Sequence, residues 1–84
     1  MGKREKLKTR LDSFPKNFTW DELVSLLNYY GFEQFNAKRG SGRKFYNSNT
    51  GTLISCHEPH PDNIVKKYVL EDVKHKLDEI DINE

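Results

Sequence analysis

The chain has 84 residues, enough for one domain with a single small core, and its aromatic content of 12% argues against full disorder. No apolar run approaches the roughly 20 residues of a membrane span, and the single cysteine, Cys56, excludes an internal disulfide and fits a reducing cytoplasm. Residues 1–52 carry 10 Lys and Arg against 5 Asp and Glu, whereas residues 53–84 carry 4 against 8, so we expect a basic face and an acidic tail.

The first expected element is a short helix within residues 3–14. Leu7, Leu11 and Phe14 recur at helical spacing and give this segment one apolar stripe. Pro15 follows and ends the helix. We interpret residues 1–17 as a helical extension that precedes the main domain.

The second expected helix covers residues 20–30. Thr19 and Glu22 have the spacing of a capping box, in which the side chain of each residue accepts a hydrogen bond from the backbone N–H of the other. Gly31 supplies a typical C-terminal stop. The apolar stripe of this helix consists of Leu23, Leu26, Leu27 and Tyr30.

Three runs of strand-forming residues follow, at 32–38, 43–48 and 52–57, and each is bounded by Gly, Asn or Ser. Such runs are typical of antiparallel hairpins. The prolines after the third run exclude a strand interior there.

Residues 65–80 show the pattern of a closing amphipathic helix, whose stripe is formed by Val69, Val73, Leu77 and Ile80. Acidic residues at its C-terminal end oppose the helix dipole, so we expect the last turn to fray into a loose tail at 81–84. The order of elements predicts an α+β fold: a three-stranded antiparallel sheet with helices on one face and an extra N-terminal helix.

The Gly-rich segment RGSGRKFY, residues 39–46, lies between the first two expected strands. It matches neither a P-loop nor a dinucleotide-binding fingerprint. One interpretation is a plain hairpin turn with solvated charges. The other is a phosphate-binding tip, because four cations gather around the turn: Lys38, Arg39, Arg43 and Lys44. Arg43 and Lys44 are neighbours on a strand, so they should point to opposite faces.

The segment SCHEPHP contains two histidines, His57 and His60. Cys56 and His57 would point to opposite faces of a strand, which argues against a shared metal ion. An imidazole can move a proton near neutral pH, so His57 is a candidate catalytic residue. The alternative is a histidine that is hydrogen-bonded at a strand end, and His60 has a similar alternative as a loop residue held by local turns.

The segments TWDELVSLLNYYGFE, KRGSGRKFYN, LISCHEPHP and VKKYVLEDVKHKL, in this order, make the chain from about Phe18 to Ile80 resemble the HicA toxin family. Members of this family are small ribonucleases that are partnered by HicB-type antitoxins. The resemblance implies a double-stranded-RNA-binding-domain-like fold over residues 18–80. It also implies metal-independent mRNA cleavage without a cofactor, and a cytoplasmic protein whose partners are RNA and a HicB-like antitoxin.

The resemblance has one departure at the hairpin. Many family members carry Gly-Ser-His there, and that histidine is taken as catalytic. This chain reads Ser41-Gly42-Arg43, so Gly42 occupies the histidine position. With that imidazole missing, His57 becomes the candidate base or acid and His60 a second proton-transfer group. Lys38, Arg39, Arg43 and Lys44 are the candidate RNA-binding residues.

Three functional hypotheses therefore follow from the sequence. The first is a ribonuclease toxin that cuts mRNA and inhibits translation. The second is a non-catalytic RNA-binding module of the same fold, which the absence of the hairpin histidine favours. The third, weaker hypothesis is a protein-interaction domain that docks a partner through its basic face or acidic tail.

Overall fold

The computed structural model describes residues 2–36, 42–59 and 62–83. The elements, in chain order, are α1 (Lys3–Asp12), α2 (Trp20–Tyr29), β1 (Glu33–Asn36), β2 (Gly42–Asn47), β3 (Thr52–His57) and α3 (Lys67–Asn83). The α+β class, the three-stranded antiparallel sheet and the extra N-terminal helix are confirmed. Within these described ranges, no helix is both long and apolar enough to span a bilayer.

Helix α2 begins at the predicted capping box. The Thr19 hydroxyl accepts a hydrogen bond from the Glu22 backbone N–H, and the Glu22 carboxylate accepts one from the Thr19 backbone N–H at 3.0 Å. Arg10 of α1 donates to the same carboxylate at 2.6 Å, and this bond holds the pKa of Glu22 below its ordinary value. The helix ends where Gly31 takes a φ of +92°, a conformation that glycine adopts without steric cost.

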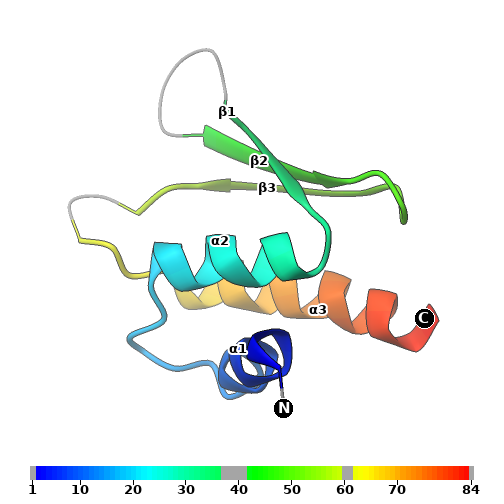
Figure 1. Ribbon diagram of the computed structural model, residues 1–84. Coiled ribbons are helices and arrows are strands. Elements are labelled where there is room, and N and C mark those ends of the chain that lie inside the picture. Colours follow the sequence, from blue (N-terminus) through cyan, green and yellow to red (C-terminus); the bar gives the residue numbers. More distant parts are fainter. Residues whose placement is uncertain (1, 37–41, 60–61, 84) are drawn as a thin grey trace.

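The sheet has the order β1-β2-β3, with antiparallel pairing throughout. Because side chains alternate along a strand, Phe45, Ile54 and Cys56 share one face and are buried. Figure 1 shows α2 and α3 below this face, with α1 beneath them. The molecule therefore has three layers, and the opposite face of the sheet is left uncovered by the described elements.

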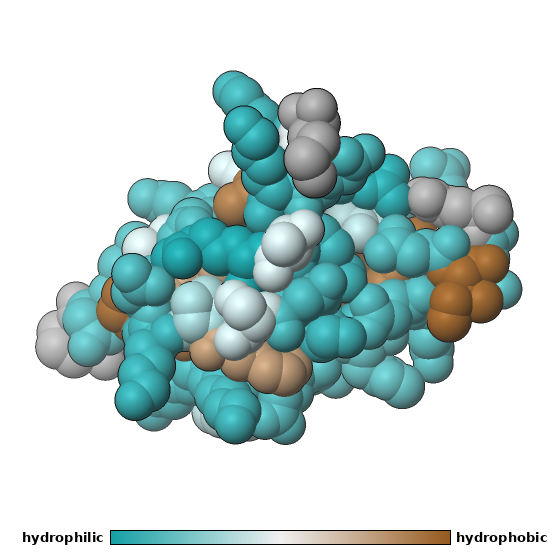
Figure 2. All heavy atoms as spheres, turned by 90° about the horizontal axis from the view of Figure 1, so that it is seen from below, coloured by the Kyte–Doolittle hydropathy of each residue, from teal (hydrophilic) through white to brown (hydrophobic). Residues whose placement is uncertain are grey.

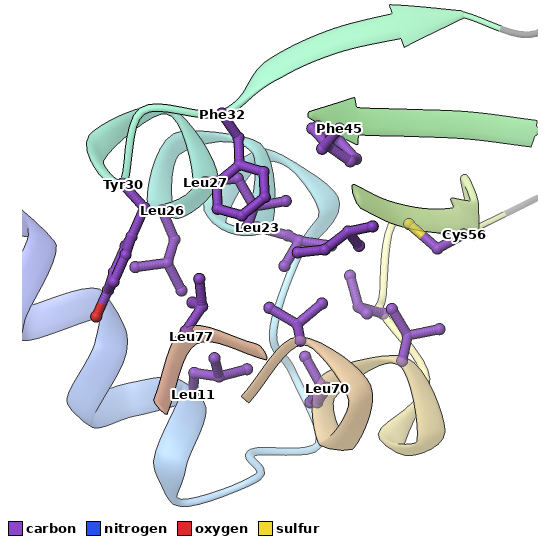
Figure 3. Packing of buried hydrophobic residues seen from close by; sticks show 14 of the residues in the cluster. Leu11, Leu23, Leu26, Leu27, Tyr30, Phe32, Phe45, Cys56, Leu70 and Leu77 are labelled. Atoms are coloured by element: carbon purple, nitrogen blue, oxygen red, sulfur yellow. The ribbon is translucent and has the colours of Figure 1, made fainter. Parts of the chain in front are cut away.

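One hydrophobic cluster fills the space between these layers (Figure 3). Phe45 of β2 is fully buried, and its ring centroid lies 5.8 Å from that of Trp20 at the start of α2. Leu11 of α1 is also fully buried, so the N-terminal helix contributes to the same core as the sheet. The remaining cluster members come mainly from the predicted stripes of α2 and α3: Leu23, Leu26, Leu27, Tyr30, Val69, Leu70, Val73, Leu77 and Ile80.

Helix α1 is mostly polar, and ion pairs hold much of it in place. The Lys8 ammonium lies 2.7 Å from Asp12 and 2.6 Å from Asp78 of α3. Burial lowers the pKa of Lys8, but the hydrogen bonds to the two carboxylates outweigh that effect and leave it raised. Figure 2 views the molecule from the side on which α1 lies and shows a mainly hydrophilic surface.

The expectation of a frayed C-terminal end was wrong for the residues that the structure describes. Helix α3 continues through Asn83. The Tyr30 hydroxyl donates to the Asp81 carboxylate at 3.0 Å, and Arg4 of α1 lies 3.2 Å from it. These partners offset the unfavourable interaction of a carboxylate with the C-terminal end of the helix dipole, so the last turn stays helical.

Candidate functional site

His57 is the last residue of β3 and is exposed. It lines a cleft of about 210 Å³ together with Glu58, Lys66 and Tyr68, between the end of the sheet and the start of α3. A neighbouring hollow of about 180 Å³ shares His57 and Tyr68 and extends to Asp72. A histidine at a strand end is thus open to solvent beside a hollow that small groups can enter, which meets the first requirement for a proton-transfer residue.

Gly42 lies directly opposite His57 in the β2–β3 ladder. Facing residues in an antiparallel pair project to the same side of the sheet, with Cβ atoms about 4.5–5.5 Å apart. The position that the resemblance assigns to the hairpin histidine is therefore next to His57. A side chain at 42 and the imidazole of His57 would share one site.

Two of the predicted RNA-binding cations lie at this end of the sheet, and they face opposite ways as expected. Arg43 is on the helix-covered side, where its Nε lies 3.3 Å from the Glu58 carboxylate. Lys44 is exposed on the open side. Lys38, Arg39 and His60 lie outside the described residues, so their positions relative to His57 stay predictions.

A basic groove that the sequence did not reveal adjoins the His57 cleft. The groove measures about 540 Å³ and is lined by Lys16, Lys66, Lys67 and Phe14, and it shares Val65 and Lys66 with the cleft. The ammonium of Lys67 lies 5.9 Å from the centre of the Phe14 ring. In the described part of the chain, none of these three lysines is paired with a carboxylate.

Most other basic side chains of the described helices are already engaged. Lys8, Arg10, Lys74 and Lys76 each lie within 4.0 Å of an Asp or Glu carboxylate. Among the described cations, the groove lysines are thus three that stay available for an external anion and lie together. One sequence signal could have found two of them: Lys66 and Lys67 stand at the start of α3, where acidic residues are usual.

Cys56, unlike its exposed neighbour His57, is buried. Its side chain is buried on the helix-covered face, and that burial, with the charge of Asp72 as a smaller cause, raises the pKa of the thiol to about 11. The thiol is therefore protonated at neutral pH and is a poor nucleophile or metal ligand. Across the described residues, no group of three or more His, Cys, Asp or Glu side chains is placed to hold a metal ion.

Cys56 is expected to react slowly with iodoacetamide in the folded protein. At pH 8, raising the thiol pKa from 9.0 to about 11 lowers the thiolate fraction roughly a hundredfold. Labelling rates followed by mass spectrometry should differ by at least that factor between native protein and protein in urea. Equal labelling rates in both states would show that the Cys56 thiol is not buried and that its pKa is not raised.

Three strands with two helices on one face, and a third helix beneath them, define a small α+β domain with an exposed strand-end histidine beside a basic groove. The family described as "HicA toxin of bacterial toxin-antitoxin" matches residues 20–81. The chain therefore belongs to the HicA toxin family, and the resemblance seen in the sequence is confirmed. Comparison with curated proteins and with solved structures gave no significant match.

Proposed function

We propose that this member of the HicA toxin family is a metal-independent ribonuclease that binds mRNA in the cytoplasm and cleaves it, which inhibits translation. The observation that carries the proposal is the place of His57. Exposed His57 lines a cleft that shares Val65 and Lys66 with a groove, and the three lysines of that groove have no carboxylate partner among the described residues. A general base beside cations that can bind phosphates is what cleavage of an RNA backbone requires.

In the proposed reaction, His57 accepts the proton of a ribose 2′-hydroxyl. The resulting 2′-oxygen attacks the adjacent phosphorus, and the bond from phosphorus to the 5′-oxygen of the next nucleotide breaks. The leaving oxygen takes a proton from a second group, for which His60 is our candidate. Lys66 lines the same cleft as His57, so its ammonium can stabilise the charge that develops on the phosphate oxygens.

An active toxin of this kind requires a neutralising partner, and we propose a HicB-like antitoxin protein. Family membership in a toxin–antitoxin group supports this partner. The antitoxin would act by covering the His57 cleft or the basic groove.

A second candidate function is RNA binding without cleavage. Gly42 favours it, because it offers no proton-transfer group opposite His57. In this case the cleft and groove would hold RNA, and no variant would alter RNA integrity.

Induced expression in a bacterial host distinguishes the two functions. The wild type should arrest growth and degrade mRNA, whereas His57→Ala should do neither while accumulating as folded protein. His75→Ala is the matched control, because His75 is exposed on α3 and paired with Glu79, away from the cleft. Arrest and mRNA loss with both variants would exclude His57 as the catalytic residue, and no effect from the wild type would favour the binding module.

RNA affinity is expected to fall steeply with added salt, because phosphate contacts release counterions. Replacing Lys66 and Lys67 by alanine should reduce the slope of log K against log[salt] by about one for each lysine that contacts a phosphate. Lys6→Ala, at an exposed position of α1 outside the groove, is the control and should leave the slope unchanged. Fluorescence anisotropy at several KCl concentrations measures the slopes, and an unchanged slope in the double variant would exclude the groove from RNA binding.

A further inference from the structure

The uncovered face of the sheet carries an unusual set of side chains. In Figure 1, both α2 and α3 lie below the sheet. The residues that alternate with the buried ones project the other way, and three of them are large hydrophobics about half exposed: Phe35 at 51%, Tyr46 at 41% and Leu53 at 49%. Hydrophobic side chains that gather on one open face mark a binding surface more often than single ones do.

The strand register fixes how these side chains are arranged. Phe35, Lys44 and Ser55 form one row across the three strands, and Glu33, Tyr46 and Leu53 form the next. Successive rows on one face are about 7 Å apart, because they are two residues apart along a strand. The two aromatic rings are therefore diagonal neighbours, and Lys44 lies between the row of Tyr46 and the row of His57.

Lys44 supplies a charge at the centre of this surface. It is exposed, and among the described residues no carboxylate is paired with it. A cation that adjoins both aromatic residues suits a ligand that alternates flat apolar groups with negative charges. Single-stranded nucleic acid has this alternation, since its bases stack on aromatic rings and its phosphates bind lysine.

The size of the face argues against a protein partner as its main occupant. Two strands of six residues and one of four, about 5 Å apart, present roughly 250 Å². A stable protein–protein interface needs about 800 Å² on each partner. The face is large enough for two stacked bases and the phosphate between them.

We propose that unpaired RNA bases stack on Phe35 and Tyr46 while Lys44 binds a phosphate, which leads the strand to His57 one row further along the same face. This inference rests on the proposed function and narrows its substrate to single-stranded RNA. Bases that are paired inside a duplex do not expose their flat faces to the two rings. Phe35 and Tyr46 are positioning residues, and the chemistry stays at His57.

The test measures binding of a fluorescein-labelled single-stranded RNA of mixed sequence, free and annealed to its complement, by anisotropy at low salt. Phe35→Ala and Tyr46→Ala should each weaken single-strand binding roughly 5- to 100-fold and leave duplex binding unchanged. Phe35→Leu keeps an apolar side chain without the ring, so it should behave like Phe35→Ala. Tyr29→Ala is the matched control, because Tyr29 is an exposed tyrosine on α2 beside α1 and should bind as the wild type does.

Wild-type affinity in Phe35→Leu, or equal affinity for single-stranded and duplex RNA, would overturn the inference while leaving a ribonuclease function intact. Wild-type RNA binding with altered self-association of Phe35→Ala in sedimentation experiments would make the face a protein interface and also overturn it. If His57→Ala still cleaves RNA but Phe35→Ala no longer does, the catalytic role proposed for His57 is wrong and the stacking surface is supported. If the wild type binds no RNA at low salt, both proposals fall.

Discussion

Replacing Gly42 with histidine is expected to raise the rate of RNA cleavage about 10²-fold or more, the lower range of what one proton-transfer group contributes. Gly42 faces His57 across the β2–β3 ladder, so a second imidazole there would lie beside the first. One ring could then remove the 2′-hydroxyl proton while the other protonates the leaving oxygen. In the proposed reaction, the wild-type chain has no side chain at position 42 that could perform the second of these transfers.

The measurement is the single-turnover rate on a short labelled RNA at pH 7, with circular dichroism to verify the fold. Gly42→Asn is the control, because its side chain is polar and hydrogen-bonding but does not titrate. Equal rates for the two variants would show that the site at 42 and 57 does not perform the chemistry. Combining Gly42→His with His57→Ala should abolish the gain, since the proposed mechanism needs both rings.

Leu11→Ala is expected to lower the free energy of unfolding by about 2–5 kcal/mol, the usual cost of emptying a leucine-sized space in a core. Leu11 is fully buried among side chains of the main domain, so the cavity would form inside the common core and not at its margin. A domain of this size has a total stability of only about 5–15 kcal/mol. The substitution would thus remove a large share of it.

Urea unfolding followed by the fluorescence of Trp20 measures this change. Leu53→Ala is the matched control, because Leu53 is 49% exposed on the open face of the sheet, and it should change stability by no more than about 0.5 kcal/mol. A loss below about 0.5 kcal/mol in Leu11→Ala would show that α1 is an appendage that the domain does not need. A loss in the expected range would make α1 part of the folding unit.

The sequence predicted well those elements whose signals are local. The Thr19–Glu22 capping box and the stop at Gly31 lie within one helix, and the structure confirms both. The three strands were also found, because their boundaries are marked by turn-forming residues a few positions away. Alternation along β2 was enough to place Arg43 and Lys44 on opposite faces.

Features that depend on distant residues were missed. The helicity of the last acidic turn depends on Tyr30 and Arg4, which are far away in the chain, and no local pattern includes them. The basic groove joins Lys16 to Lys66 and Lys67 in the same way. The pairing of Gly42 with His57 follows from the strand register, which the spacing of the two residues alone did not define.

The ion pairs between α1 and α3 have a consequence for how the chain acquires its fold during synthesis. Lys8 of α1 is paired with Asp78 of α3, and Arg4 with Asp81, so α1 gains these ion pairs only after α3 has been synthesised. A ribosome adds about 5–20 residues per second. Until residues 78–81 have emerged from it, the nascent chain lacks both ion pairs, and its core lacks the contributions of Leu77 and Ile80. These residues therefore reach their final arrangement only after α3 has left the ribosome.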